Sequence, residues 1–467
     1  MVRLRGKQAP QSTVAIPRRQ ASRQIDPVIG ILLSRVRESL RHQKLTQDIA
    51  FSMGSFVVLA ISGIVINIVI TALRDAAALG VFNIAYAVYI VVSQFAVLGL
   101  HYSVLRHTAY YHESAVERGR MLFTASLMVL ALGFLAAGAM ILAQPLFDSF
   151  FSSTNASQAI RNSALGLLLF PLNKVLLAYL NGLRQMKAFS ILQALRYLSL
   201  MVVVSAVAAS NMPIENATFG FLVAEIITAV ATIAFLASRR LASHLVYCRT
   251  WVGKHLAFGS KGLMAGMFAE VNSRIDVLMI GYFLSDRATG IYSFAAMLID
   301  GLYQVLAMIR INFNPILVAA IRDGKLDQAQ RLRVLSGRYV APTMLALSAL
   351  LALSFYLFTS WILPGKGLSE GLPALLILMA GLNAIAIFVP FDNLLMVSGH
   401  PGYQTGQQLA TVIANIVVAA VLLPVLGIEG AALGTAVSYI CGITVLLIFG
   451  RRLLGWELVR NKVKQYG

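Results

Sequence analysis

Apart from a short break that holds Asp286 and Arg287, the stretch between residues 261 and 322 is apolar and carries five charged side chains: Glu270, Arg274, Asp276, Asp300 and Arg310. A charge in membrane hydrocarbon costs roughly 2.5–3.5 kcal/mol on insertion scales, so each needs a partner or a water-filled cavity. Guanidinium groups suit anions, because each can donate two parallel hydrogen bonds to one phosphate. Arg274 and Arg310 are therefore candidates for phosphate contact, and a purely structural role is the equal alternative.

Helical spacing predicts how some of these charges pair. Glu270 and Arg274 are four residues apart, so they share one face of a continuous helix and are expected to form an ion pair. Asp276 lies on another face of the same helix.

Polar residues also recur on one face of two further helices, and an offset of 210 residues relates Asn83 to Ser293 and Gln94 to Gln304. The spacing of about 100° per residue keeps each set within a narrow arc. The two sets are Asn83, Gln94 and His101, and Ser293, Asp300 and Gln304. They are expected to form opposite walls of one cavity, while hydrogen bonding between packed helices is the alternative.

Two prolines followed by polar residues occupy corresponding places in the two halves, Phe-Pro-Leu-Asn-Lys at 170–174 and Val-Pro-Phe-Asp-Asn at 389–393. Paired interruptions of this kind mark transport pathways, because the freed carbonyl groups must face protein or water. Lys174, Asp392 and Asn393 are the pathway candidates. A kink that serves packing alone is the alternative.

The composition is that of a multi-pass membrane protein, with 58% hydrophobic and 12% charged residues and a mean hydropathy of +0.77. A span needs roughly 20 apolar residues to cross ~30 Å of hydrocarbon. Twelve such segments are predicted, near residues 51–73, 79–104, 120–145, 160–182, 187–210, 216–238, 256–284, 289–319, 339–363, 370–398, 403–425 and 429–450.

The net charge of +19 reflects membrane topology and does not indicate nucleic-acid binding. Thirty-one of the 38 Lys and Arg residues fall in the two tails and the even-numbered turns, which places both termini in the cytoplasm by the positive-inside rule. The odd-numbered turns hold Arg74, Arg161, Arg287 and Lys366. Only Lys174, Arg274 and Arg310 are assigned to the interior of spans.

An internal repeat divides the chain, because residues 213–220 before the sixth span match residues 427–434 before the twelfth. The expected fold is all-α, with two parallel six-helix lobes around a central cavity. The predicted parts are a basic cytoplasmic tail at 1–47, lobes at 48–238 and 256–450, a basic linker at 239–255 and a second tail at 451–467. Val28, Leu32, Val36 and Leu40 favour an amphipathic helix in the first tail, and a disordered tail is the alternative.

No cofactor or metal site is expected. The seven histidines and two cysteines lack the spacing of metal ligands, and no phosphate-binding loop for ATP occurs.

Arg274-Ile-Asp276 in one span, followed by Ala-Thr-Gly-Ile-Tyr-Ser-Phe-Ala at 288–295 in the next, resembles polysaccharide flippases of the O-antigen or exopolysaccharide type. These belong to the MATE-like superfamily of multidrug, oligosaccharidyl-lipid and polysaccharide exporters. The resemblance implies a MATE-like fold in the bacterial inner membrane and outward transfer of a polyprenyl-diphosphate-linked oligosaccharide by alternating access. It also implies contacts with membrane lipids and with polysaccharide polymerase and export machinery as partners, and no enzymatic activity.

A cation-coupled multidrug antiporter of the same superfamily is the main alternative. Such exporters usually rely on acidic residues in the first lobe, including one in the first span, and here Glu225 is the only acid assigned to the membrane region of that lobe. The relative that flips the peptidoglycan precursor is less favoured, because its pattern has several arginines in the first two spans. A polymerising enzyme would need a large outer loop, and the longest, at 146–159, is short.

Overall fold

The computed structural model describes residues 47, 51, 53–151, 153–324 and 326–455, and these form helices joined by short turns. The expected tail helix around Val28–Leu40 lies outside the described residues. The first lobe, as we use the term, comprises residues 53–238. Its helices are Met53–Leu73, α2 (Ala76–Val97), α3 (Leu100–Tyr110), α4 (Ala115–Leu142), α5 (Gln144–Phe150), α6 (Thr154–Ala164), α7 (Phe170–Gly182), α8 (Met186–Ala209) and α9 (Phe219–Ser238), with the short 3-10 helices η1 (Leu165–Leu168) and η2 (Ile214–Thr218).

The second lobe comprises residues 275–454, and α10 (Arg249–Asn272) connects it to the first. Its helices are α11 (Ile275–Phe283), α12 (Asp286–Arg322), α13 (Leu326–Leu335), α14 (Ala341–Leu357), α15 (Leu372–Ile385), α16 (Leu394–Val397), α17 (Pro401–Leu426) and α18 (Ile428–Leu454). The π-helical turns η3 (Ser336–Val340) and η4 (Phe358–Ile362) flank α14, while the 3-10 helices η5 (Leu368–Gly371) and η6 (Val389–Phe391) flank α15.

Ten helices of the described part are long and apolar enough to cross a membrane, and a bent pair makes an eleventh span. The chain is therefore an all-helical, multi-pass membrane protein. The predicted seventh span, 256–284, is not one helix, because α10 ends at Asn272 and α11 begins at Ile275. Arg274 lies in the break, with φ −129° and ψ −14°. This break separates Glu270 from Arg274, which the sequence placed on one helical face.

Two more predicted spans are interrupted. Leu98 and Gly99 both have left-handed backbone angles, with φ of 47° and 67°, and they separate α2 from α3. The expected stripe of Asn83, Gln94 and His101 therefore does not lie on one helix. Pro171 lies in the first turn of α7, which is bent by 42° from the helix before it.

The second lobe is interrupted at the corresponding proline. Pro390 lies in η6, between α15 and α16. Each proline removes one backbone donor and so favours the end of one helix and the start of another.

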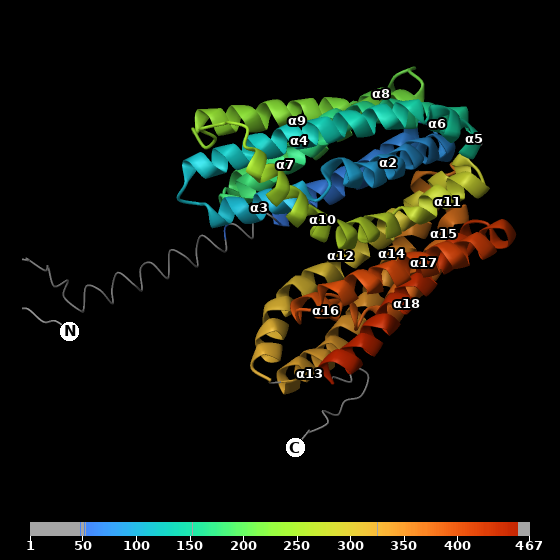
Figure 1. Cartoon of the computed structure of the whole chain (residues 1–467). Coiled ribbons are helices and arrows are strands. Elements are labelled where there is room, and N and C mark those ends of the chain that lie inside the picture. Colours follow the sequence, from blue (N-terminus) through green and yellow to red (C-terminus); the bar gives the residue numbers. More distant parts are fainter. Residues whose placement is uncertain (1–46, 48–50, 52, 152, 325, 456–467) are drawn as a thin grey trace, which may run out of the picture. The chain divides into compact units, whose positions relative to one another are not determined.

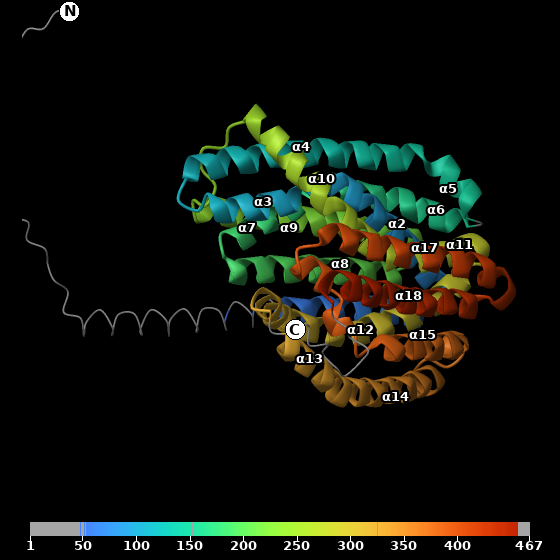
Figure 2. The same ribbon diagram turned by 60° about the horizontal axis from the view of Figure 1, so that its bottom comes forward.

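Within the first lobe α3 packs on α7 and α8 packs on α9, while within the second lobe α17 and α15 both pack on α18 (Figures 1 and 2). Contact between the lobes is made chiefly by α2, which lies against α12 and α11. The connecting helix α10 lies against α3 and α4 of the first lobe and against α17 of the second. The polar faces predicted on α2 and α12 therefore belong to the two helices that join the lobes.

Glycines allow α2 and α12 to approach closely near their N-terminal ends. A Cβ atom on Gly80 would overlap the carbonyl oxygen of Asp286, and one on Gly290 would overlap the carbonyl oxygen of Ala76. The two contacts are reciprocal, because Gly80 and Gly290 are separated by the same 210 residues as Ala76 and Asp286. Close backbone contact of this kind is how small residues join membrane helices.

The start of α10 is fixed to the first lobe by a buried polar and aromatic cluster. Ser103 Oγ is 2.9 Å from His255 Nδ1, His255 Nε2 is 3.2 Å from the carbonyl oxygen of Met121, and Trp251 Nε1 donates to Glu117 at 3.1 Å. Trp251 and His255 are both fully buried. The linker predicted at 239–255 therefore becomes helical at Arg249 and packs on the first lobe.

Candidate functional site

A buried ion pair lies in the first lobe between α8 and α9. Arg196 Nη2 is 2.6 Å from Glu225 Oε1, and the two side chains are 12% and 2% exposed. Asn173 donates to the other carboxylate oxygen at 2.7 Å and to the Glu225 carbonyl at 2.8 Å. The sequence analysis missed Arg196 because it was counted with a cytoplasmic turn. Two features of the sequence could have indicated this pair. Arg196 lies ten residues inside α8, and Glu225 is the only acid assigned to the membrane region of the same lobe.

Aromatic rings surround this pair. Tyr89 stacks on Phe221 with ring centroids 4.6 Å apart and meets Phe170 edge to face at 5.5 Å. The Arg196 guanidinium lies 4.5 Å from the centroid of Phe170. Tyr86 extends the stack, 5.8 Å from Phe221. Sequence reasoning singled out none of these aromatic residues.

Lys174 is placed next to this group, on α7. Its ammonium lies 5.5 Å from the centroid of Phe170, and no side chain in the described part forms a salt bridge or hydrogen bond with it. It interacts electrostatically with Glu225 of its own lobe and with Glu270 from the end of α10. Lys174 is thus a half-buried cation whose charge is balanced only at longer range.

Arg274 reaches the first lobe from the break between α10 and α11. Its guanidinium lies 5.0 Å from the centroid of Tyr86 on α2, and its Nε has no hydrogen-bond partner among the described residues. The predicted Glu270–Arg274 ion pair is wrong: the two groups are not within 4.0 Å in the described coordinates. The cause is the helix break, which turns Arg274 away from the face that carries Glu270.

Asp300 completes the group from α12. It is exposed in the middle of that helix, and Arg274, Asp276 and Glu270 all act on it electrostatically. We call Lys174, Glu270, Arg274 and Asp300 the inter-lobe charge cluster. Its two positive and two negative charges come from α7, α10, the α10–α11 break and α12, and no two of them form a direct salt bridge in the described structure.

Asp276, another predicted pathway residue, is instead engaged within the second lobe. It is 6% exposed and accepts hydrogen bonds from Tyr292 Oη at 2.5 Å, from Val277 N at 2.9 Å and from Thr435 at 3.4 Å. These contacts satisfy the carboxylate and make its role in this structure one of packing.

Arg310 and Asp392 pair with each other. Arg310 Nη1 is 3.0 Å from Asp392 Oδ2, and Gln407 donates to Oδ1 at 2.8 Å. Tyr303 Oη accepts from Arg310 at 3.4 Å. The sequence selected both charges but did not predict that they are partners. Asn393, beside Asp392, is half-buried.

The remaining predicted residues differ in exposure. Asn83 donates to Asn67 at 3.2 Å, and Gln94 makes contacts of 3.5 Å with Ile90 O and Ser93 Oγ. His101 is half-buried, and its Nδ1 has no partner among the described residues. On α12, Ser293 is 7% exposed, whereas Gln304 is exposed. Only part of each predicted stripe therefore faces open space.

The described residues contain no group of three or more His, Cys, Asp or Glu side chains placed to hold a metal ion.

The fold is that of an all-helical, multi-pass membrane protein with charged side chains buried inside it. Residues 69–363, more than half of the chain, match the family described as "Polysaccharide biosynthesis protein". The chain belongs to this family. No curated protein sequence matches the chain.

Solved structures of MATE and other MOP superfamily transporters have a similar fold. An inward-facing MATE family multidrug resistance transporter is 13% identical, with a TM-score of 0.70 over 85% of this chain and 95% of that one. The lipid II flippase MurJ, in an inward closed conformation, is 14% identical, with a TM-score of 0.69 over 86% and 87%. A MOP superfamily transporter from Pyrococcus furiosus Vc1 is 14% identical, with a TM-score of 0.57 over 88% and 95%. At these identities the likeness concerns the fold alone.

Proposed function

We propose that this protein is a flippase that moves a polyprenyl-diphosphate-linked oligosaccharide from the cytoplasmic to the outer leaflet of the bacterial inner membrane. The family supports a role in polysaccharide biosynthesis. Transfer proceeds by alternating access between two lobes of six spans each, twelve in all when the interrupted segments are counted as single spans. Both termini lie in the cytoplasm, where the tails carry an excess of basic residues.

The observation that carries the proposal is the inter-lobe charge cluster. Two cations and two carboxylates meet between the lobes without pairing directly, although unpaired charges in a membrane interior are expensive. A solvated chamber that accepts a charged and hydroxyl-rich head group explains why they are kept apart. A polar head group cannot cross ~30 Å of hydrocarbon unaided, and such a chamber replaces its hydration.

Lys174 and Arg274 are the residues that we assign to the diphosphate. Lys174 lies on α7 of the first lobe and Arg274 lies in the break just before the second lobe, so both can hold one anion only while these two elements are close together. Arg274 offers two parallel donors and Lys174 a point charge. Arg310 is less suited, because Asp392 already neutralises it.

The multidrug antiporter is disfavoured by Arg196. A cation site in the first lobe would depend on Glu225, and that carboxylate is already bonded to a guanidinium and to Asn173. Purified protein in vesicles would decide this point. The antiporter would accumulate an organic cation against a proton or sodium gradient, whereas the flippase would not respond to that gradient with such a cation.

Charge removal tests the assignment in cells that make the lipid-linked precursor. Lys174→Met and Arg274→Met should each lower export of surface polysaccharide about tenfold or more, because a hydrogen bond to a charged group is worth about 1.5–3 kcal/mol. The lipid-linked precursor should accumulate in the inner leaflet. The control is Arg161→Met, which removes an exposed cation.

Membrane levels of each variant must be measured alongside export. Normal export in both single variants and in the double variant would refute the assignment of Lys174 and Arg274. Loss of export in Arg161→Met as well would show that the assay responds to charge in general.

A further inference from the structure

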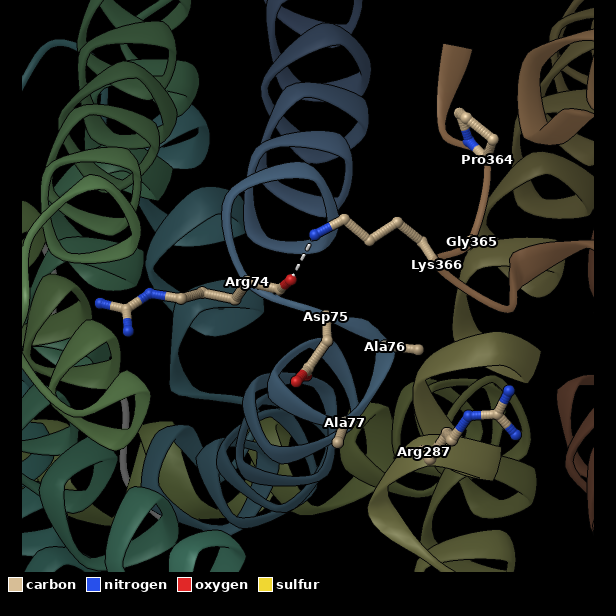
Figure 3. Close-up of a pocket in the computed structure, with 8 residues that line it drawn as sticks. All are labelled: Arg74, Asp75, Ala76, Ala77, Arg287, Pro364, Gly365 and Lys366. Carbon is tan, nitrogen blue, oxygen red and sulfur yellow. Dashed lines mark hydrogen bonds between the residues drawn. The ribbon is translucent and has the colours of Figure 1, made fainter. Parts of the chain in front are cut away.

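A cavity of about 420 Å³ lies where the N-terminal ends of α2 and α12 meet the loop before α15 (Figure 3). Three of the four basic residues predicted on the odd-numbered turns line it, although they are far apart in sequence: Arg74, Arg287 and Lys366. The fourth, Arg161, is exposed elsewhere.

Lys366 connects the lobes directly. Its Nζ donates a hydrogen bond of 2.6 Å to the carbonyl oxygen of Arg74, 292 residues earlier in the chain. Figure 3 shows the lysine side chain extended across the cavity to reach that oxygen. A bond from an ammonium group is stronger than one between neutral groups.

Arg74 is itself fixed to the end of α8. Its Nε donates to the carbonyl oxygen of Ala208 at 2.9 Å, and its Nη2 donates to those of Val207 at 3.3 Å and Met212 at 2.8 Å and to that of Ser210. The guanidinium points away from the cavity in Figure 3. The carbonyl that Lys366 reaches is therefore held in place by contacts with another span of the first lobe.

The loop that carries Lys366 is held from the second lobe. Arg287, on α12, makes two bonds with Glu370, of 2.9 and 2.6 Å. Its guanidinium also lies so close to Gly367 that a Cβ there would overlap it. Gly367 has a φ of +75°, which favours glycine in any case. Both ends of the Lys366–Arg74 contact are thus supported by their own lobe.

We propose that the Lys366–Arg74 hydrogen bond is a latch that holds this end of the transporter closed, and that its release accompanies opening of the pathway at this end. The inference rests on the proposed transport function. An anion-binding site is the less consistent explanation, because the Arg74 and Arg287 guanidinium groups are engaged by carbonyl oxygens and by Glu370. Just inside the latch, the reciprocal contacts of Gly80 and Gly290 bring the lobes together.

Thiol labelling of a residue beyond the latch tests the proposal. The native thiols are first removed by Cys248→Ser and Cys441→Ser, and Asn83→Cys, on α2 inside Gly80, is the reporter. The labelling rate with a small hydrophilic maleimide is measured in right-side-out and in inverted vesicles. Lys366→Met should raise the labelling rate about tenfold in right-side-out vesicles. The reason is that loss of one charge-assisted hydrogen bond shifts the equilibrium from the closed to the open state by about that factor.

Two matched variants control for non-specific effects. Lys366→Arg keeps a charged donor and should label at the parental rate, while Arg161→Met removes an exposed cation without touching the latch. An unchanged rate in Lys366→Met in both kinds of vesicle, or an equal rise in Arg161→Met, would overturn the latch. Export is measured separately in the same variants. Faster labelling in Lys366→Met with no transport of lipid-linked glycan by the parent would support the latch and reject the proposed function.

Discussion

Removal of Arg196 should destabilise the protein strongly, because it leaves Glu225 as an unpaired charge in the first lobe. The pair is 2.6 Å long and its side chains are 12% and 2% exposed. Breaking a buried pair by deleting one partner costs about 3–5 kcal/mol, whereas replacing both partners is often close to neutral. Arg196→Met should therefore lower the free energy of unfolding by about 3 kcal/mol or more. The double variant Arg196→Met/Glu225→Gln should recover much of that loss.

The chain contains a comparison pair with the same separation. Arg287 and Glu370 are also 2.6 Å apart, but their side chains are 54% and 55% exposed. Exposed pairs contribute about 0–1 kcal/mol. The assay is a double-mutant cycle on each pair, with the free energy of unfolding measured by denaturant titration of detergent-solubilised protein.

We expect a coupling energy of about 2 kcal/mol or more for Arg196–Glu225 and below about 1 kcal/mol for Arg287–Glu370. Coupling energies that agree within about 0.5 kcal/mol would refute the reasoning, because burial would then have no effect on the pair.

Three further outcomes follow from packing, exposure and protonation. Gly290→Ala should destabilise the protein by about 1–3 kcal/mol in the same titration, because its new Cβ overlaps a backbone carbonyl of α2. The control, Gly301→Ala, lies in open space on the same helix and should be neutral or stabilising. If it lowered the free energy of unfolding as much as Gly290→Ala, the close contact would be contradicted. With the native cysteines replaced, Gln304→Cys should react with a hydrophilic maleimide faster than Ser293→Cys, which is buried, and the reverse order would contradict the exposure of α12. Burial, together with the neighbouring charges of His107 and Lys254, lowers the pKa of His255 to about 4. Between about pH 6.5 and 4 the unfolded state therefore binds more protons than the folded state, and stability is lost as the pH falls through that window. Over that range the free energy of unfolding of His255→Gln should fall by up to about 3 kcal/mol less than that of the parent. Identical pH profiles of the free energy of unfolding would contradict the shift.

Hydropathy and charge predicted the membrane class and most of the spans because these properties are averages over roughly 20 residues. Breaks within spans depend on single backbone conformations. Leu98 adopts a φ of 47°, which leucine rarely does. The break between α10 and α11 is formed by Ser273 and Arg274, so no proline or glycine marks it in the sequence. The sequence therefore predicted continuous faces where the structure has none.

The site was predicted as a set of charged residues rather than as a set of contacts. Arg274 and Asp300 were selected because charge inside an apolar span is costly, and Lys174 was selected because it follows a proline that interrupts a span in both halves. Neither argument needs a structure. Which charge meets which depends on how helices distant in sequence pack. For this reason the sequence missed the contact between Arg310 and Asp392 and proposed one between Glu270 and Arg274 that the structure lacks.

Reconstituted transport tests the central claim most directly. Purified protein is placed in liposomes that contain a polyprenyl-diphosphate-linked oligosaccharide, and a glycan-modifying enzyme added outside measures how fast the inner leaflet is emptied. The account predicts rapid transfer by the parent protein and a rate lowered about tenfold or more in Lys174→Met/Arg274→Met. Transfer by the parent no faster than in protein-free liposomes, or equally fast in the double variant, would contradict it.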